Sequence, residues 1–144
     1  MEKLDEIFFY TLEKSIKIYR KYAQSQILKN NFEITIDQWL ILKTLQENKG
    51  LSQNQIAELV FKDIASITRI IEILVNKKLI DRKIDTNDRR KFNLEITENG
   101  NKIIEKIYPI VIENRKQALT DLSIEEINNL KSQLEKIITN CKTS

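Results

Sequence analysis

The sequence predicts a mainly α-helical chain that is interrupted once by a short β-hairpin. Three segments begin with a hydroxyl residue followed three positions later by Gln or Glu, at Thr35, Ser52 and Ser123. This spacing marks the start of a helix, because the two side chains satisfy each other's free backbone amides. Only the stretch Phe92–Ile96 alternates apolar and polar residues as a half-buried strand does. With two glycines and one proline in 144 residues, the chain has few points at which a helix must break.

The composition excludes most classes of enzyme active site. The chain has no histidine and a single cysteine, Cys141, so it cannot build a Ser-His-Asp or Cys-His arrangement, a thiolate cluster or a histidine-containing zinc site. Its two glycines also leave no glycine-rich loop for phosphates or dinucleotides. A metal site made of carboxylates alone, or an enzyme that uses Asp, Glu or Lys, stays open, but no feature of the sequence points to either. We expect that the chain is not an enzyme and holds neither a metal nor a cofactor.

The same totals predict a single domain, residues 1–144, that works in the cytoplasm. Hydrophobic residues make up 41% and charged residues 31% of the chain, as in an ordinary globular protein. No apolar run approaches the ~20 residues of a membrane span, and the first residues carry acids in place of the apolar core of a secretory signal. The lone Cys141 fits a reducing compartment. No membrane contact is expected.

Four helices are predicted before the hairpin. The first, Leu4–Lys29, carries an apolar stripe at helical spacing, made of Leu4, Phe8, Leu12, Ile16, Tyr19, Ala23 and Ile27. The second, Ile36–Glu47, is expected to bury Ile36, Trp39, Leu40, Leu42 and Leu45. The third, Gln53–Val60, is expected to bury Ile56, Leu59 and Val60. The fourth, Ile64–Asn76, follows a very short connection in which Asp63 stands in the capping position.

The fourth helix has two different faces. Its inner face is aliphatic and consists of Ile64, Ile67, Ile71 and Leu74. At about 100° per residue, the opposite face carries Lys62, Ala65, Ser66, Arg69, Glu72 and Asn76. Ile73 also falls on the outer side, where the pattern gives no reason for an isoleucine. Two helices joined by a tight turn, the second with small, hydroxyl and arginine side chains facing outward, form the helix-turn-helix pattern.

A hairpin and two further helices follow. Leu79–Ile84 is expected to pair back on Lys91–Ile96, with Asp85–Arg90 as the tip. The last helices are expected at Glu98–Leu119 and Ile124–Asn140, and Pro109 should kink or divide the former because it lacks a backbone donor.

The positive charge is concentrated around the hairpin. Residues 61–92 contain nine basic and five acidic side chains, a net charge of +4, whereas the whole chain carries only +3. One segment therefore holds all the excess, as expected for a surface that meets phosphates. A hairpin directly after a helix-turn-helix is a wing, and exposed Arg89 and Arg90 at its tip suit the negative potential of a DNA minor groove. The fold class is thus a winged helix-turn-helix with a two-stranded wing and long N- and C-terminal helices.

The segment Asp63–Gly100 resembles the core signature of the MarR family of bacterial winged-helix transcriptional regulators. The resemblance is carried by Thr68-Arg69, by Leu79 and Arg82, by Asp85-x-x-Asp88-Arg89-Arg90 and by Thr97-x-x-Gly100, which follow in the family's order and spacing. The two preceding helices also match, through Thr35, Gln38, Trp39, Leu42 and Leu45 and through "LSQNQIAELV".

The resemblance implies a homodimer in which residues 1–30 and 101–144 are dimerisation helices and residues 35–97 form the DNA-binding lobe. It implies a sequence-specific transcriptional regulator, a repressor that responds to a ligand or other signal and binds double-stranded DNA at a pseudo-palindromic operator. The sequence does not indicate which small molecule acts as the effector. The resemblance also implies that Asp88 holds Arg90 extended through an ion pair.

The expected DNA-binding residues lie on the outer face of the fourth helix and on the wing, and they are Lys62, Ala65, Ser66, Thr68, Arg69, Arg89, Arg90 and Lys91, with Asp88 as the positioning residue. Lys78 stands where the family usually has the glycine of a left-handed turn, a conformation that costs other residues about 1 kcal/mol or more, and the sequence leaves the form of the helix end open there. The alternative function is a winged-helix module that binds protein without DNA, for which an uncharged wing is expected.

Overall fold

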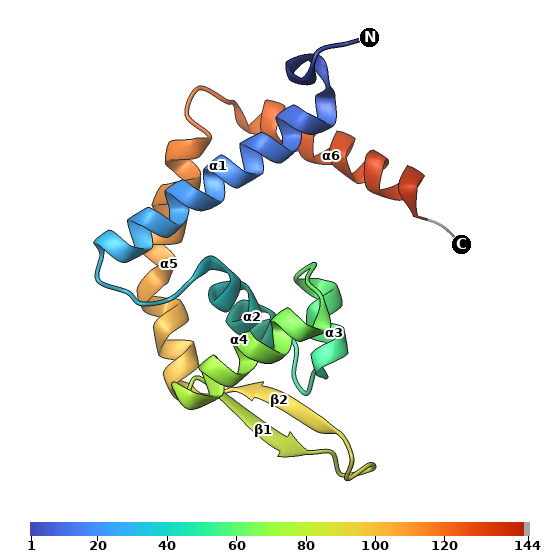
Figure 1. Ribbon diagram of the computed structural model, residues 1–144. Helices are drawn as coiled ribbons and strands as arrows, with labels where there is room; N and C mark the ends of the chain where they lie inside the picture. The colour runs from blue at the N-terminus through green and yellow to red at the C-terminus, as the bar shows by residue number, and fades with distance from the viewer. Residues whose placement is uncertain (143–144) are drawn as a thin grey trace. The chain divides into compact units, whose positions relative to one another are not determined.

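The computed structural model describes residues 1–142 and confirms a mainly α-helical winged-helix fold (Figure 1). The chain forms two compact units, Met1–Asn114 and Arg115–Ser144. The first unit contains α1 (Phe8–Lys29), α2 (Ile36–Glu47), α3 (Gln53–Leu59), α4 (Ile64–Asn76), β1 (Ile80–Ile84), β2 (Phe92–Ile96) and most of α5 (Glu98–Ala118). The second contains the end of α5 and α6 (Ile124–Cys141). Among the described helices, none combines the length and apolarity needed to cross a membrane.

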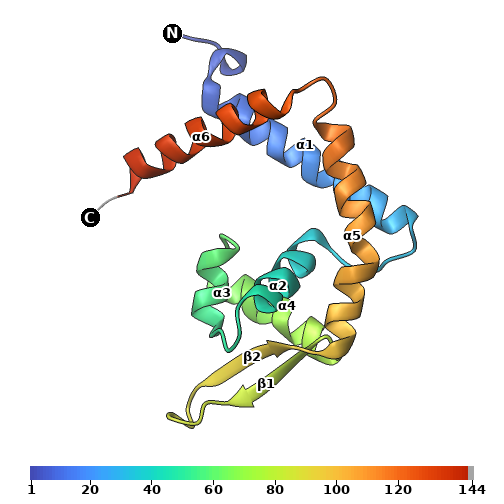
Figure 2. The same cartoon turned by 180° about the vertical axis from the view of Figure 1, so that it is seen from behind.

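One core holds the first unit together. The largest fully buried side chains come from α2, α3, α4, both strands and α5, and they are Ile41, Leu42, Ile56, Ile67, Ile71, Leu74, Ile80, Leu94 and Ile107. Helix α1 reaches this core only through its last turns, at Ala23 and Ile27. Near that point the amide of Asn114 donates a 3.4 Å hydrogen bond to the Ala23 carbonyl, which ties α5 to α1. Both ribbon views show α2, α3 and α4 gathered above the hairpin, which projects away from them (Figure 2).

The hairpin is antiparallel and its register places apolar residues on the core side. Ile80 pairs with Ile96, Arg82 with Leu94 and Ile84 with Phe92. The backbone N–H of Leu94 also donates to the carbonyl of Leu51 at 3.0 Å, which ties the base of the wing to the segment before α3. Because only the base is buried, Ile84 and Phe92 are exposed farther out on the wing.

The three helix starts predicted from capping pairs are confirmed. In α2 the Thr35 hydroxyl accepts the Gln38 N–H at 3.0 Å, and the Gln38 side chain accepts the Thr35 N–H at 3.1 Å. The same reciprocal pair forms at Ser52 with Gln55 before α3 and at Ser123 with Glu126 before α6. Each pair satisfies two amides that have no partner inside the helix.

The end of α4 keeps the left-handed turn although it has a lysine there. Lys78 has φ +61, its N–H donates to the Val75 carbonyl, and the Leu79 N–H donates to the Leu74 carbonyl, both at 2.9 Å. These two bonds form a Schellman motif, which normally uses glycine. Leu74 and Leu79 are both buried, so their packing offsets the backbone strain. The helix end that the sequence left open at Lys78 is therefore a left-handed turn.

The first helix begins later than predicted. Leu4–Glu6 form a separate 3₁₀ turn, Ile7 is extended with ψ 121, and α1 starts at Phe8. No side chain caps α1 at Ile7, and Leu4 is exposed. Neither a cap nor core contacts therefore stabilise an extra helical turn at this end.

Two residues expected to be inside lie on the surface. Leu59 is exposed because α3 turns Ile56, Ala57 and Val60 inward, and Leu59 sits off that face. Ile64 is exposed because it begins α4 beyond the edge of the core.

Pro109 does not divide α5, which is continuous from Glu98 to Ala118. Pro109 and Glu105, one turn earlier, are both exposed, so water can satisfy the carbonyl left without a donor.

Candidate nucleic-acid interface

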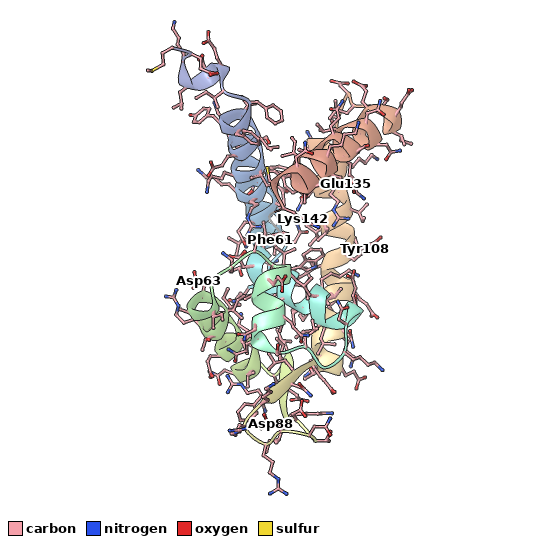
Figure 3. The ribbon with its side chains drawn as sticks, turned by 90° about the vertical axis from the view of Figure 1, so that its right-hand side faces the viewer. Phe61, Asp63, Asp88, Tyr108, Glu135 and Lys142 are labelled. Atoms are coloured by element: carbon pink, nitrogen blue, oxygen red, sulfur yellow. The ribbon has the colours of Figure 1, made fainter. Side chains whose placement is uncertain are left out.

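The start of α4 is held by Asp63, which lies in the turn that follows α3 (Figure 3). Its carboxylate accepts the Ser66 N–H at 2.8 Å and the Ser66 hydroxyl at 3.0 Å. The hydrogen bond from the Ser66 backbone, followed by that from its hydroxyl, holds the pKa of Asp63 below its usual value. A negative charge at a helix N-terminus is stabilised by the helix dipole, so this cap fixes where α4 begins.

The hydroxyls of the first turns of α4 already have partners. The Ser66 hydroxyl donates a hydrogen bond to the Asp63 carboxylate. Thr68 donates to the Ile64 carbonyl at 2.9 Å and accepts from the Gln53 amide at 3.0 Å, which joins α4 to α3. These two side chains therefore organise the helix-turn-helix.

Lys62 takes part in a charged network inside the unit. Its ammonium lies 3.1 Å from the Asp37 carboxylate, and Arg20 of α1 contacts the same carboxylate. Lys62 is half-buried. Asp37 thus links α1, α2 and the turn before α4, a role that the sequence did not predict because the three residues are far apart in the chain.

The tip of the wing is organised by a second aspartate. The Asp85 carboxylate accepts the N–H of Asn87 at 2.7 Å and of Asp88 at 3.2 Å, and the Asn93 amide reaches it from β2 at 3.3 Å. These bonds, led by the one from Asn87, lower the pKa of Asp85. The loop closes through two 3.0 Å backbone bonds, from Asp85 to Lys91 and from Lys91 to Asp88. The tip is therefore an ordered turn.

Asp88 lies at the far end of the hairpin and contacts Arg90 (Figure 3). One carboxylate oxygen accepts the Arg90 backbone N–H at 3.0 Å and its Nε–H at 3.3 Å. The side chain of Arg90 is 92% exposed, while that of Asp88 is 32% exposed. The ion pair therefore leaves the outer nitrogens of the guanidinium pointing into solvent.

Several cations around the wing already have anionic partners. Arg82 contacts Glu72 of α4, and Lys83 lies 2.9 Å from Glu95 across the hairpin. The hydrogen bond with Glu95, together with its charge, raises the pKa of Lys83. Within residues 1–142, no ion pair forms at four exposed cations of this surface, Arg69, Lys78, Arg89 and Lys91. These four can neutralise phosphates without first breaking an internal contact.

The structure therefore divides the predicted residues into groups. Ala65 and Arg69 lie on the exposed outer face of α4, and Arg89, Arg90 and Lys91 lie on the wing. Ser66, Thr68 and Lys62 belong to the supporting network. Of this network, the sequence predicted only that Asp63 caps α4, because the other contacts between side chains join residues that are far apart in the chain.

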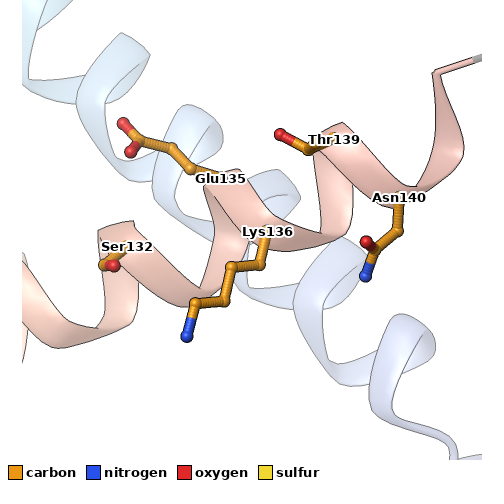
Figure 4. Close-up of a pocket in the computed structure, with 5 residues that line it drawn as sticks. All are labelled: Ser132, Glu135, Lys136, Thr139 and Asn140. Carbon is orange, nitrogen blue, oxygen red and sulfur yellow. The ribbon is translucent and has the colours of Figure 1, made fainter.

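A shallow hollow lies on the second unit, along the polar side of α6 (Figure 4). Its lining consists of Ser132, Glu135, Lys136, Thr139 and Asn140, which are all exposed. Successive turns of one helix supply all five side chains. The hollow holds no buried polar group that would bind a ligand.

Comparison with known proteins finds transcriptional regulators. Residues 34–92, which contain α2, α3, α4 and the wing up to the start of β2, match the model of the MarR family. The central part of the chain is thus similar to MarR-family regulators. It is 26% identical over 138 residues to an uncharacterised HTH-type transcriptional regulator, YhbI of Bacillus subtilis, covering 93% of this chain and 90% of that protein.

Solved structures agree over almost the whole length. The Staphylococcus aureus MepR–DNA complex is 27% identical with a TM-score of 0.82, covering 93% of this chain and 98% of MepR. Bordetella bronchiseptica BpsR, whose DNA binding is regulated by 6-hydroxynicotinic acid, has a TM-score of 0.86 and covers 95% of this chain and 96% of its own. At 21% identity, the likeness to BpsR concerns the fold alone. The chain therefore has the fold of a transcriptional regulator, and the MarR family that its central segment matches is one of regulators and not of enzymes.

Proposed function

We propose that this protein is a MarR-family repressor that binds a pseudo-palindromic operator as a homodimer. One observation carries the proposal: Arg69 on the outer face of α4 and Arg89 and Lys91 on the wing are exposed and form no ion pair within residues 1–142. In a winged helix, α4 enters the major groove and the wing meets the flanking minor groove. Arg69 is then the base-reading arginine, and Arg89, Arg90 and Lys91 contact the minor groove and phosphates.

The homodimer is supported by apolar surface that the chain does not cover itself. Helix α6 has no buried residue, although Leu130 and Ile138 lie on its apolar side. On α1, the side chains of Phe8, Phe9 and Ile16 are exposed. We propose that residues 1–30 and 101–144 pair with a second copy, and that residues 35–97 form the DNA-binding lobe. Contiguous apolar stripes of this length mark an interface.

Ligand control and location complete the proposal. BpsR responds to a small aromatic acid, and we propose a small-molecule effector for this chain too, without assigning its identity. A regulator of transcription works beside bacterial DNA, so the proposed location is the cytoplasm.

The wing provides the test. Arg90→Ala should weaken operator binding by about 1–3 kcal/mol, because it removes a minor-groove contact. Asp88→Asn removes the negative charge but keeps an oxygen that can accept the Arg90 backbone N–H. If Asp88 positions Arg90, Asp88→Asn should weaken binding too, although deleting an acid beside phosphates ought to strengthen it. Fluorescence anisotropy of each single variant and of the double variant measures both effects.

Asp81→Asn is the matched control, since it deletes an exposed acid from β1 that forms no ion pair within residues 1–142. Its binding should equal that of the wild type or exceed it slightly. Tighter binding by Asp88→Asn, or effects that simply add in the double variant, would remove the positioning role from Asp88. A flat affinity between low and moderate salt would count against DNA binding as a whole, because phosphate contacts release counterions.

A further inference from the structure

The first turns of α4 have little capacity left for hydrogen bonds to bases. Ser66 uses its only hydroxyl proton on Asp63, and Thr68 uses its own on the Ile64 carbonyl while accepting from Gln53. Each of these bonds holds the cap or the contact between α3 and α4. Reading a base with either hydroxyl would first break a contact that positions the helix, so these side chains are poor candidates for direct readout.

The outer stripe of α4 consists of an arginine with one apolar side chain before it and one after it. Ala65, Arg69 and Ile73 follow at intervals of four residues and therefore lie on one face. All three are exposed, and Ile73 exposes 44% of its surface. Glu72, the neighbouring acid, is held to the side by Arg82 of the wing. Ile73, for which the sequence pattern gave no reason, is thus part of the same surface as Arg69.

The chemistry of this stripe selects a kind of base sequence. In the major groove, arginine pairs with the two acceptors of guanine, and apolar side chains contact the C5-methyl group of thymine. Four residues of helix rise about 6 Å, against about 3.4 Å per base pair, so each apolar residue reaches about two base pairs from the guanine.

We infer that α4 reads each half-site as a guanine flanked on both sides, within about two base pairs, by thymines whose methyl groups contact Ala65 and Ile73. This inference rests on the proposed function and specifies the DNA that it recognises. Specificity then comes from methyl contacts and one arginine, while the hydroxyls serve to fix the position of α4.

The experiment first selects bound sites from a random duplex library with the full-length protein. Each thymine of the selected half-site is then replaced by uracil, which differs only in lacking the methyl group. Wild-type affinity should fall about 3- to 5-fold at the thymine that faces Ile73, the worth of one buried methyl group. Replacing that pair by C·G should lower affinity further, and 5-methylcytosine at the same place should recover part of the loss.

Variants assign the contact to its side chain. Ile73→Ala should bind the thymine site more weakly and should no longer distinguish thymine from uracil at that position. Ile73→Val keeps a branched apolar side chain and should keep the distinction. Arg69→Ala should lose the preference for guanine and keep the sensitivity to uracil. Thermal unfolding of each variant shows whether the fold is intact.

The outcomes separate the inference from the proposed function. Uracil that is neutral at every thymine of a selected site overturns the inference and leaves DNA binding in place. Sensitivity to uracil that persists in Ile73→Ala also overturns the assignment to Ile73. A library from which no sequence is enriched overturns the proposed function, and the inference fails with it.

Discussion

The lobe built by α2, α3, α4 and the base of the wing differs from the arm helices α1 and α6 in where their apolar residues go. In the lobe, α4 turns Ile67, Ile71 and Leu74 into a core that is fully closed to solvent. In α6, residues at equivalent helical spacing, such as Leu130 and Ile138, stay on the surface. Both helices are amphipathic in sequence. Only the lobe finds within the same chain the surfaces that cover its apolar face.

The difference teaches that an amphipathic stripe predicts burial without saying what covers it. Leu74 packs against strands that follow it directly, and the chain connecting them is short. The apolar side of α6 has no such neighbour in its own unit, whose other helical residues are the last turn of α5. A second copy of the chain is the proposed cover.

The largest expected effect lies in the arms. Leu130→Glu on α6 should dissociate the proposed dimer, because it places a charge in an apolar interface, and the loss should reach at least the ~2–5 kcal/mol of a buried leucine truncation. Sedimentation should then show a species of 17.0 kDa in place of one of twice that mass.

Asn128→Glu is the control, since it adds the same side chain on the polar side of α6 and should leave the mass unchanged. A wild-type protein that already sediments at 17.0 kDa in micromolar solution would contradict the proposed dimer. The apolar residues of α1 and α6 would then be exposed in the monomer, without a second copy to cover them.

A smaller effect is expected at a close approach inside the lobe. A Cβ on Gly100 would lie 2.5 Å from the Leu79 carbonyl oxygen and 2.6 Å from Cγ1 of Ile96. Gly100→Ala should therefore lower the free energy of unfolding by about 1–3 kcal/mol, although alanine inside a helix is normally favourable. Urea unfolding measures the loss.

Gly50→Ala provides the matched comparison, because nothing lies within 4 Å of its added Cβ and only its φ of +69 opposes alanine. Gly50→Ala should cost less than Gly100→Ala. Equal losses would show that the contact at Leu79 relaxes freely and that the lobe is looser than its burial indicates.

The end of α4 offers a change of opposite sign. Lys78→Gly should raise the free energy of unfolding by up to about 1 kcal/mol, because glycine removes the strain of φ +61. Lys77→Gly, one residue earlier at φ −78, should give no gain. Chemical unfolding of both variants measures the difference, and a gain at Lys77 equal to that at Lys78 would remove strain as the cause.

The smallest effect concerns acid, and it touches both regions. The pKa of Asp63 in the lobe and of Glu126 in α6 is lowered by hydrogen bonds from Ser66 and Ser123 respectively. A lowered pKa in the folded state stabilises the fold at pH values above the usual pKa, near 3.8 for Asp63 and 4.5 for Glu126, and this stabilisation is lost as pH falls below them.

Asp63→Asn and Glu126→Gln should each flatten the fall in thermal stability below about pH 4.5 relative to the wild type. Asp63→Asn reports on the lobe and Glu126→Gln reports on α6. Far-UV circular dichroism measures unfolding, and sedimentation at the same pH measures dissociation of the proposed dimer. Identical profiles for the wild type and both variants would mean that neither cap carries the acid sensitivity.

Much of the molecule was readable from local sequence. The bounds of α2 and α4 were predicted correctly, since Thr35 and Asp63 mark their starts and the apolar spacing carries through to their ends. The pairing of the two wing strands was also predicted, to within one residue at the start of each strand. The errors came where packing decides: Leu59 and Ile64 lie on the surface although each looked apolar enough to be inside.

The candidate site also contains residues that the sequence predicted and contacts that it did not. Its exposed members, Arg69, Arg89 and Arg90, follow from their place in the pattern. The ion pairs that support the helix-turn-helix do not follow from the sequence, because Asp37 contacts Lys62 and Arg20, which lie far from it along the chain.

By itself, the sequence determined the order of the elements, their capped starts and the concentration of positive charge on one segment, since each of these depends on residues within a few positions of one another. Only the tertiary structure decided which cations remain without a partner, that Lys78 takes a left-handed turn, and that Ile73 stands beside Arg69 on an open face. Those outcomes depend on segments that are far apart in the chain and meet in the core. The packing of Leu74, Leu79 and Leu94 sets the backbone conformation at the end of α4 and the positions of the charged side chains around it.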